Sequence, residues 1–133
     1  MFTPVHARAA SAYKRVGIES VVNGSDPHQL TQMIFQALLQ ALSKARTQMV
    51  QGDVVGKGQS INRALHLLQE GLDEALDMKK GGEIALSLRS LYSYCGVRLS
   101  LANAHNDPVI LDEVRALIEP ISQAWDQIRP AVN

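Results

Sequence analysis

The stretch from Asp26 to Met49, "DPHQLTQMIFQALLQALSKARTQM", decides the fold class. Asp26 can cap a helix, Pro27 suits the first helical position, and Gln29 completes a capping-box arrangement. Apolar residues then recur at positions 30, 34, 37, 41 and 45, which is the spacing of one helix face. The pattern predicts a long amphipathic helix that ends near Gly52.

Three further helices are predicted toward the C-terminus. Asp53 can cap a second helix, whose apolar stripe runs through Leu76 before two glycines interrupt it. Asp107 can cap the last helix, in which Pro120 predicts a kink or a short break. The helix between them has four residues on one predicted inner face: Ile84, Leu88, Leu91 and Cys95.

Strand patterns are nearly absent, so we expect an all-α protein that folds as an antiparallel four-helix bundle. A short additional N-terminal helical segment is expected around Ala7 to Val16. A length of 133 residues fits one domain. We therefore predict a single domain over residues 1–133, with an N-terminal arm over 1–24 and the bundle over 25–133.

The charge balance argues against nucleic-acid binding. Thirteen basic residues match thirteen acidic ones, and the longest basic runs are pairs. Phosphate binding requires clustered cations, which this chain lacks. The sequence shows neither a signal-peptide pattern nor an apolar stretch of bilayer length. We therefore expect a soluble cytosolic protein without membrane insertion, in which the single Cys95 forms no internal disulfide.

The glycine-rich segments do not form a convincing phosphate loop. "GDVVGKGQS" (52–60) has its glycines at the wrong spacing and follows no predicted strand, which favours a helix start. "KKGGE" (79–83) is interpreted as a helix end with basic residues, a glycine turn, and Glu83 in the first turn of the next helix.

No arrangement of side chains suggests a cofactor, a metal site or catalysis. The four histidines are far apart and form no ligand pair at helical spacing. The cluster of Glu70, Asp73, Glu74 and Asp77 is typical of a solvated helix face. Cys95 falls on the inner face, where a thiol behaves as a small hydrophobe. We expect no enzyme, no cofactor and no metal.

Apolar residues also occur away from the predicted core stripes. Because a bundle helix needs only about three core positions in seven, this excess must be covered by something. A wide core or the N-terminal arm would cover it, and so would another protein's amphipathic segment. The sequence does not decide between a monomer and a dimer, because a spare groove can be self-covered or swapped. The residues are Phe35, Leu39 and Leu42 on the first long helix and Leu86, Val97 and Leu101 on the third.

Several segments together resemble one family. They are "AYKRVGIES" (12–20), the stretch from Ser25 to Arg46, "QGDVV" (51–55), "KGGEIALSLRSLYSY" (80–94), "RLSLANAHND" (98–107) and "EVRALIEPISQAW" (113–125). In this order and spacing they resemble the flagellin-specific export chaperones of the FliS family. The resemblance covers the chain from about Tyr13 to Ile128.

The resemblance implies a cytosolic helical bundle in the flagellar type III export pathway. Such a protein would bind the disordered C-terminal segment of flagellin one to one, prevent premature polymerisation and assist delivery to the export gate protein. The chain departs from the family pattern at Ala10, at Gln36-Ala37 and at Pro120. The first two departures touch the expected groove and concern its fine specificity.

Candidate partner-binding residues come from the resemblance and from the surplus apolar positions. They are Tyr13, Val16, Ile18, Phe35, Leu39, Leu42, Tyr92, Tyr94, Leu99 and Asn103. A helical adaptor or regulator that binds another partner's amphipathic segment is the alternative. Composition does not distinguish the two functions. The quoted segments, taken together, favour the chaperone.

Overall fold

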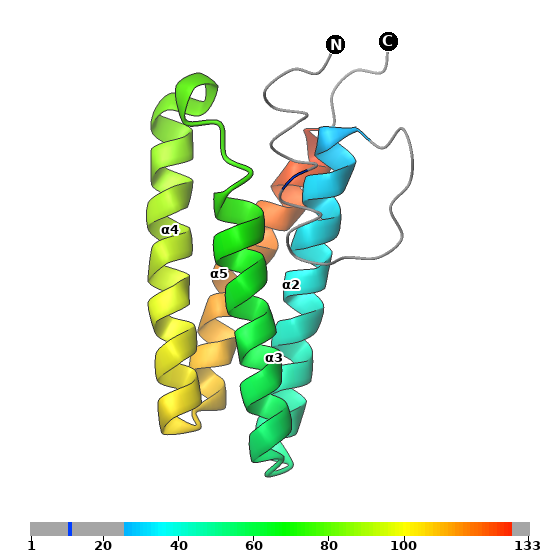
Figure 1. The fold of residues 1–133 in the computed structure, drawn as a ribbon, viewed down its shortest axis with the longest axis vertical. Helices are drawn as coiled ribbons and strands as arrows, with labels where there is room; N and C mark the ends of the chain where they lie inside the picture. The colour runs from blue at the N-terminus through cyan, green and yellow to red at the C-terminus, as the bar shows by residue number, and fades with distance from the viewer. Residues whose placement is uncertain (1–10, 12–25, 129–133) are drawn as a thin grey trace.

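The computed structural model describes Ser11 and residues 26–128, and within this part the chain forms an antiparallel helical bundle (Figure 1). The helices are α2 (Pro27–Val50), α3 (Val54–His66), α4 (Met78–His105) and α5 (Pro108–Gln127), with a π-helical turn η1 (Leu67–Asp73) continuing α3. The predicted all-α bundle is confirmed. The expected N-terminal helical segment and arm lie outside the described residues.

Three of the predicted helix starts are confirmed by their aspartate caps. The backbone N–H of Gln29 donates to Asp26 at 2.7 Å, and that of Gly56 donates to Asp53 at 2.9 Å. Asp107 accepts in the same way from the N–H of Val109 at 3.0 Å. Each carboxylate satisfies a backbone donor that has no partner within the helix.

The start of α4 differs from the prediction. The carboxylate of Asp77 accepts from the backbone N–H groups of Lys79 and Lys80, so the helix begins at Met78. The two lysines therefore belong to a first turn of α4 and do not end the helix formed by α3 and η1. The predicted glycine break before Glu83 is confirmed. The interruption comes at Gly82, whose φ of 53° and ψ of −128° are accessible almost only to glycine.

The second and last helices also differ from their predicted form. The second predicted helix widens into π geometry at Leu67 and ends at Asp73, short of Leu76. The last helix, α5, continues through Pro120 without the short break that we allowed for. Proline removes one backbone donor, and buried neighbours such as Ile118 hold the helix against the bundle.

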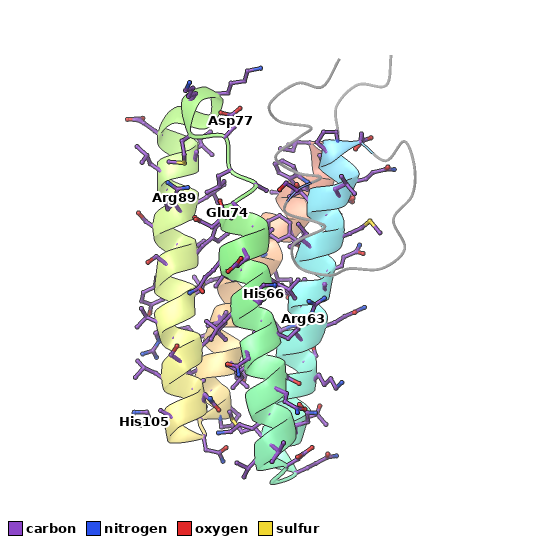
Figure 2. All side chains as sticks on the ribbon, in the orientation of Figure 1. Arg63, His66, Glu74, Asp77, Arg89 and His105 are labelled. Carbon is purple, nitrogen blue, oxygen red and sulfur yellow. The ribbon has the colours of Figure 1, made fainter. Side chains whose placement is uncertain are left out.

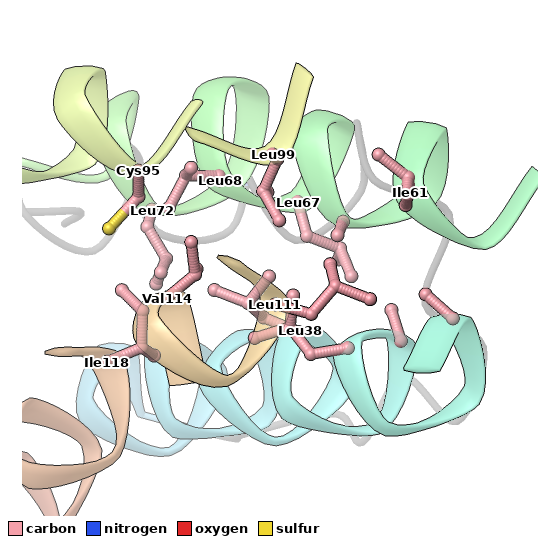
Figure 3. Close-up of a cluster of buried hydrophobic side chains, with 14 of the residues drawn as sticks. Leu38, Ile61, Leu67, Leu68, Leu72, Cys95, Leu99, Leu111, Val114 and Ile118 are labelled. Carbon is pink, nitrogen blue, oxygen red and sulfur yellow. The ribbon is translucent and has the colours of Figure 1, made fainter. Parts of the chain in front are cut away.

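The core lies between the four helices, where aliphatic side chains meet along the bundle axis (Figure 3). α2 packs against α3, η1 and α5, while α4 packs against α3, η1 and α5. The backbones of α2 and α4 do not approach one another closely, so these two helices lie diagonally opposite. Each helix contributes fully buried side chains to this core, among them Leu38, Ile61, Leu67, Leu99, Leu111 and Ile118.

One predicted core position lies outside this core. Ile84 falls on the inner side of α4 by helical phase but is 73% exposed. Ile84 follows Gly82 in the first turns of α4, and Figure 1 shows these turns extending beyond the end of η1. The same helix buries Cys95 completely, as predicted.

Candidate partner-binding surface

α4 presents an apolar surface on the side that faces away from the core. Its buried residues, among them Cys95 and Leu99, lie about 180° around the helix from this side, since successive residues turn by about 100°. Four large apolar side chains stand there in solvent: Leu86 (57% exposed), Tyr94 (46%), Val97 (59%) and Leu101 (37%). We call these residues, together with the exposed Ser90 and Ser93 between them, the outer face of α4.

A groove of about 450 Å³ borders this face where α4 meets η1. Gly96 brings the two helices close together: a Cβ at this position would lie 3.3 Å from Nε2 of Gln69. Arg89, labelled on α4 in Figure 2, closes the groove by pairing its Nε with Asp73 of η1 at 3.1 Å. Val97 belongs both to the groove and to the outer face.

A smaller apolar pocket of about 60 Å³ lies where α2, the segment after η1, α4 and α5 meet. Tyr92 lines both this pocket and the larger groove, with Phe35 and Leu88 among its apolar neighbours. Burial raises the pKa of Tyr92, and nearby Asp73 raises it further. The phenol therefore stays neutral and presents an aromatic wall to both hollows.

The pocket is closed on one side by contacts between the start of α2 and the end of α5. The rings of His28 and Trp125 stack with their centroids 4.9 Å apart. The indole Nε1–H of Trp125 donates to the carbonyl of His28 at 3.0 Å, and the His28 ring bonds in return to the carbonyl of Trp125. These reciprocal contacts hold the ends of α2 and α5 together.

Tyr94 is held in place by α5. Its hydroxyl donates to Glu113, whose other carboxylate oxygen accepts from Nε of Arg98 at 2.7 Å. These two hydrogen bonds keep the pKa of Glu113 below its ordinary value. The hydrogen bond to Glu113 raises the pKa of Tyr94, so its ring stands at a fixed, uncharged position on the outer face.

The described residues group no metal ligands, and the cysteine among them is unreactive. Among the described residues, no three His, Cys, Asp or Glu side chains are grouped so as to hold a metal ion. Burial, with a smaller contribution from Glu113, raises the pKa of Cys95 to about 11, so its thiol is not a nucleophile at neutral pH. No helix in the described part is long and apolar enough to cross a membrane.

Comparison with known proteins identifies the family. The family model described as "Flagellar protein FliS" matches residues 9–132. The chain belongs to the FliS family. The flagellar secretion chaperone FliS of Salmonella typhimurium is 44% identical over 96% of this chain and 94% of its own length. FliSB of Pseudomonas aeruginosa is 40% identical over 91% of this chain and 95% of its own. FliS of Bacillus subtilis is 28% identical over 82% and 80%, respectively.

The candidate residues on α4 divide between surface and core. Tyr94 is exposed on the outer face, and Tyr92 lies in the wall between the two hollows. Leu99 is fully buried in the core. Asn103 offers its backbone carbonyl to Nζ of the buried Lys57 at 2.7 Å, which ties the start of α3 to the end of α4. The structure thus brings Tyr92 and Tyr94 to the candidate surface and gives Leu99 and Asn103 structural contacts.

The surplus apolar residues of α2 lie in different places from those of α4. Phe35 and Leu42 are almost completely buried, so the wide core, one of the alternatives that the sequence left open, covers them. α2 is enclosed by α3, η1 and α5, which cover a wider arc than one stripe. Leu39 is half-buried at the edge of the core. The roles of these residues in partner binding remain predictions.

Three candidate residues precede the described helices, and two residues of the outer face of α4 were not predicted. Tyr13, Val16 and Ile18 lie outside the described residues. Sequence reasoning missed Ser90 and Ser93, which connect the apolar residues of the outer face. Their helical phase relative to Cys95 and Leu99 was the signal that would have placed them there.

Proposed function

We propose that this chain is a cytosolic flagellar secretion chaperone that binds the C-terminal segment of flagellin one to one. Binding would prevent premature polymerisation and assist delivery of flagellin to an export gate protein. The matched relatives are named flagellar secretion chaperones, and this chain covers nearly their whole length. Both facts support the chaperone role. The choice of the flagellin C-terminal segment as client rests on the family resemblance.

The observation that carries the proposal is the outer face of α4 beside the groove. Four exposed apolar side chains at helical spacing suit the apolar side of an amphipathic helix, and the adjoining groove of about 450 Å³ admits further side chains. Monomeric proteins rarely expose large continuous apolar patches without a binding role. A flagellin segment that folds on this surface would cover it.

The energetics of such binding suit a client that must be released. A disordered segment can bury roughly 1,000–3,000 Å² on binding, yet ordering it costs several kcal/mol of the gross interaction energy. The complex would therefore be firm enough to block polymerisation and weak enough for export. No covalent chemistry is required at any step.

We assign the predicted residues to two roles in this proposal. Tyr94 would contact flagellin directly, and Tyr92 would form the floor of the groove. Phe35 and Leu99 would support the surface from within the core. Tyr13, Val16, Ile18 and Asn103 remain proposed contacts on the resemblance alone. Leu39 and Leu42 remain proposed contacts because of their surplus apolar positions on α2.

Calorimetric titration with flagellin segments tests the proposal. We expect saturable one-to-one binding of the C-terminal segment, a negative heat-capacity change, and no binding of the N-terminal segment. Val97→Glu should weaken binding at least about tenfold, because it places a charge in an apolar contact. Val55→Glu, at a 72% exposed position in the first turn of α3, is the matched control and should leave the affinity unchanged. Equal affinities for the two variants would reject the outer face of α4 as the site.

A further inference from the structure

Two tyrosines of α4 stand two residues apart and are held by different means. Tyr92 is buried, so the side chains around it fix its ring. Tyr94 lies on the outer face of α4 and is 46% exposed, and packing alone leaves such a ring free to change rotamer. Its hydroxyl donates to Oε2 of Glu113 on α5 at 2.5 Å. This hydrogen bond fixes the outer end of the ring to the neighbouring helix.

Glu113 is itself held by Arg98, which follows Tyr94 by about one helical turn on α4. The Nε–H of Arg98 donates to Oε1 of Glu113 at 2.7 Å, while Tyr94 uses Oε2. The Glu113 side chain is 34% exposed, so without these partners it would move in solvent. Because each oxygen has a partner on α4, the carboxylate cannot turn without breaking one of the two bonds. The two donors and the acceptor therefore form one connection that orients the Tyr94 ring.

The position of the ring is the main consequence of this connection. An exposed hydroxyl can also bond to water, and a partly exposed ion pair adds little to stability. A partner that binds an exposed side chain must restrict its rotamers, which weakens the affinity. A side chain that is already fixed avoids this loss. Tyr94 is therefore prepared for contact before any partner arrives.

We propose that Glu113 positions Tyr94 for client binding and that Arg98 holds Glu113 in place for this role. Glu113 acts through the ring and makes no essential contact with the client. The fixed position of the ring is a property of the free protein, whereas the effect on client affinity rests on the proposed function.

Asp112 supplies the matched control, because it precedes Glu113 on α5 and forms an ion pair of the same kind. Its carboxylate accepts from Arg46 on α2 at 2.6 and 3.1 Å. This ion pair joins α5 to the helix that lies diagonally opposite α4. Asp112→Ala therefore removes an ion pair of α5 and leaves the contacts of Tyr94 in place.

The ring position is measured in the full chain without any client. Scalar couplings about χ1 of isotopically labelled tyrosine report whether Tyr94 keeps one rotamer. We expect a single rotamer in the parent and in Asp112→Ala, and averaging over rotamers in Glu113→Ala. Thermal unfolding of each variant checks that the bundle remains folded at the temperature of the measurement.

Calorimetric titration with the C-terminal segment of flagellin measures the effect on affinity. Glu113→Ala and Tyr94→Phe should each raise Kd about three- to tenfold, the effect expected when one side chain loses its fixed position. The double variant should lose no more than either single variant, because both changes break the same hydrogen bond. Glu113→Gln should lose less, since its amide oxygen still accepts one hydrogen bond. Asp112→Ala should bind as the parent does.

The outcomes separate the positioning role from the proposed function. A single Tyr94 rotamer in Glu113→Ala would overturn the positioning role, whether or not flagellin binds. A further loss of affinity when Glu113→Ala is added to Tyr94→Phe would show that Glu113 contacts the client directly, which also overturns it. A mobile ring with unchanged affinity would overturn the effect on binding and leave the proposed function intact. If the parent binds no flagellin segment, the proposed function and the effect on affinity fail together, and the ring measurement alone decides whether Glu113 positions Tyr94.

Discussion

At the scale of single residues, Glu113 is the connection between α5 and the candidate surface. It accepts hydrogen bonds from Tyr94 and from Arg98, both on α4. Without Glu113, the Tyr94 hydroxyl would lose the hydrogen bond that fixes it to α5. Arg98 would lose its ion-pair partner. A charged residue outside the apolar face thus controls the position of an aromatic residue within it.

This contact predicts a pH dependence of stability. The pKa of Glu113 is lowered from its ordinary 4.5, so the folded protein releases this proton more readily than the unfolded chain. Its stabilising contribution is therefore complete above about pH 5 and is lost as the pH falls through the lowered folded pKa. Glu113→Gln should be less stable than the parent at neutral pH, and the difference should shrink on acidification.

Urea unfolding of parent and variant between about pH 7 and pH 3 measures this difference. Glu83→Gln, which changes an exposed carboxylate on the same helix as Tyr94, is the control and should show no comparable trend. If the parent and Glu113→Gln differ by the same free energy of unfolding at every pH, the charge on Glu113 does not contribute to stability through these hydrogen bonds.

At the scale of secondary structure, the start of α3 packs closely against the end of α2. Gly56 lies against both its own cap and α2: a Cβ there would come 2.3 Å from Oδ2 of Asp53 and 2.7 Å from Nε2 of Gln48. Gly58, two residues further along the same helix, has open space around the corresponding position. The two glycines have equal intrinsic helix propensity and differ only in their surroundings.

Alanine substitutions at these glycines should therefore have opposite effects. Gly58→Ala should stabilise the protein by about 0.5–1 kcal/mol, because alanine loses less conformational entropy than glycine in a helix. Gly56→Ala should destabilise it by about 1–2 kcal/mol, because the methyl group displaces the Asp53 cap. Chemical denaturation of the two variants measures both signs. Equal effects of the same sign would show that the cap contact at Gly56 does not constrain the backbone.

The sequence predicted some helix boundaries correctly and missed others. The caps at Asp26, Asp53 and Asp107 follow from local chemistry, because a carboxylate and the nearest backbone donors are neighbours in the sequence. The cap at Asp77 was missed because the following glycines gave a stronger signal for a turn. The π geometry of η1 has no equivalent signal in the apolar spacing.

At the scale of the whole molecule, α4 occupies a different environment from α2. Both helices pack against α3, η1 and α5, yet the side of α4 opposite Cys95 and Leu99 carries the exposed apolar residues. This difference separates residues that stabilise the fold from residues that are available to a partner. It also divides the predicted binding residues into two groups that an experiment can distinguish.

Leu99 and Tyr94 provide the matched test of this division. Leu99→Ala removes a fully buried side chain and should lower the free energy of unfolding by about 2–5 kcal/mol. Tyr94→Ala should change stability by less than about 1 kcal/mol, and should weaken flagellin binding more than Leu99→Ala does at a temperature where both variants are folded. Thermal unfolding and calorimetric titration of both variants give the comparison. A larger binding defect in Leu99→Ala would contradict the assignment of Tyr94 to the surface.

The sequence by itself determined that this chain is helical, where three of its helices begin, and which family it resembles. These features depend on interactions between residues a few positions apart, such as the Asp26 cap and the apolar spacing that follows it. Only the tertiary structure decided which apolar residues are covered. Phe35 and Val97 are both surplus apolar positions on amphipathic helices, but one is buried and the other exposed. The physical reason is that burial depends on how neighbouring helices enclose each face, which no local pattern records.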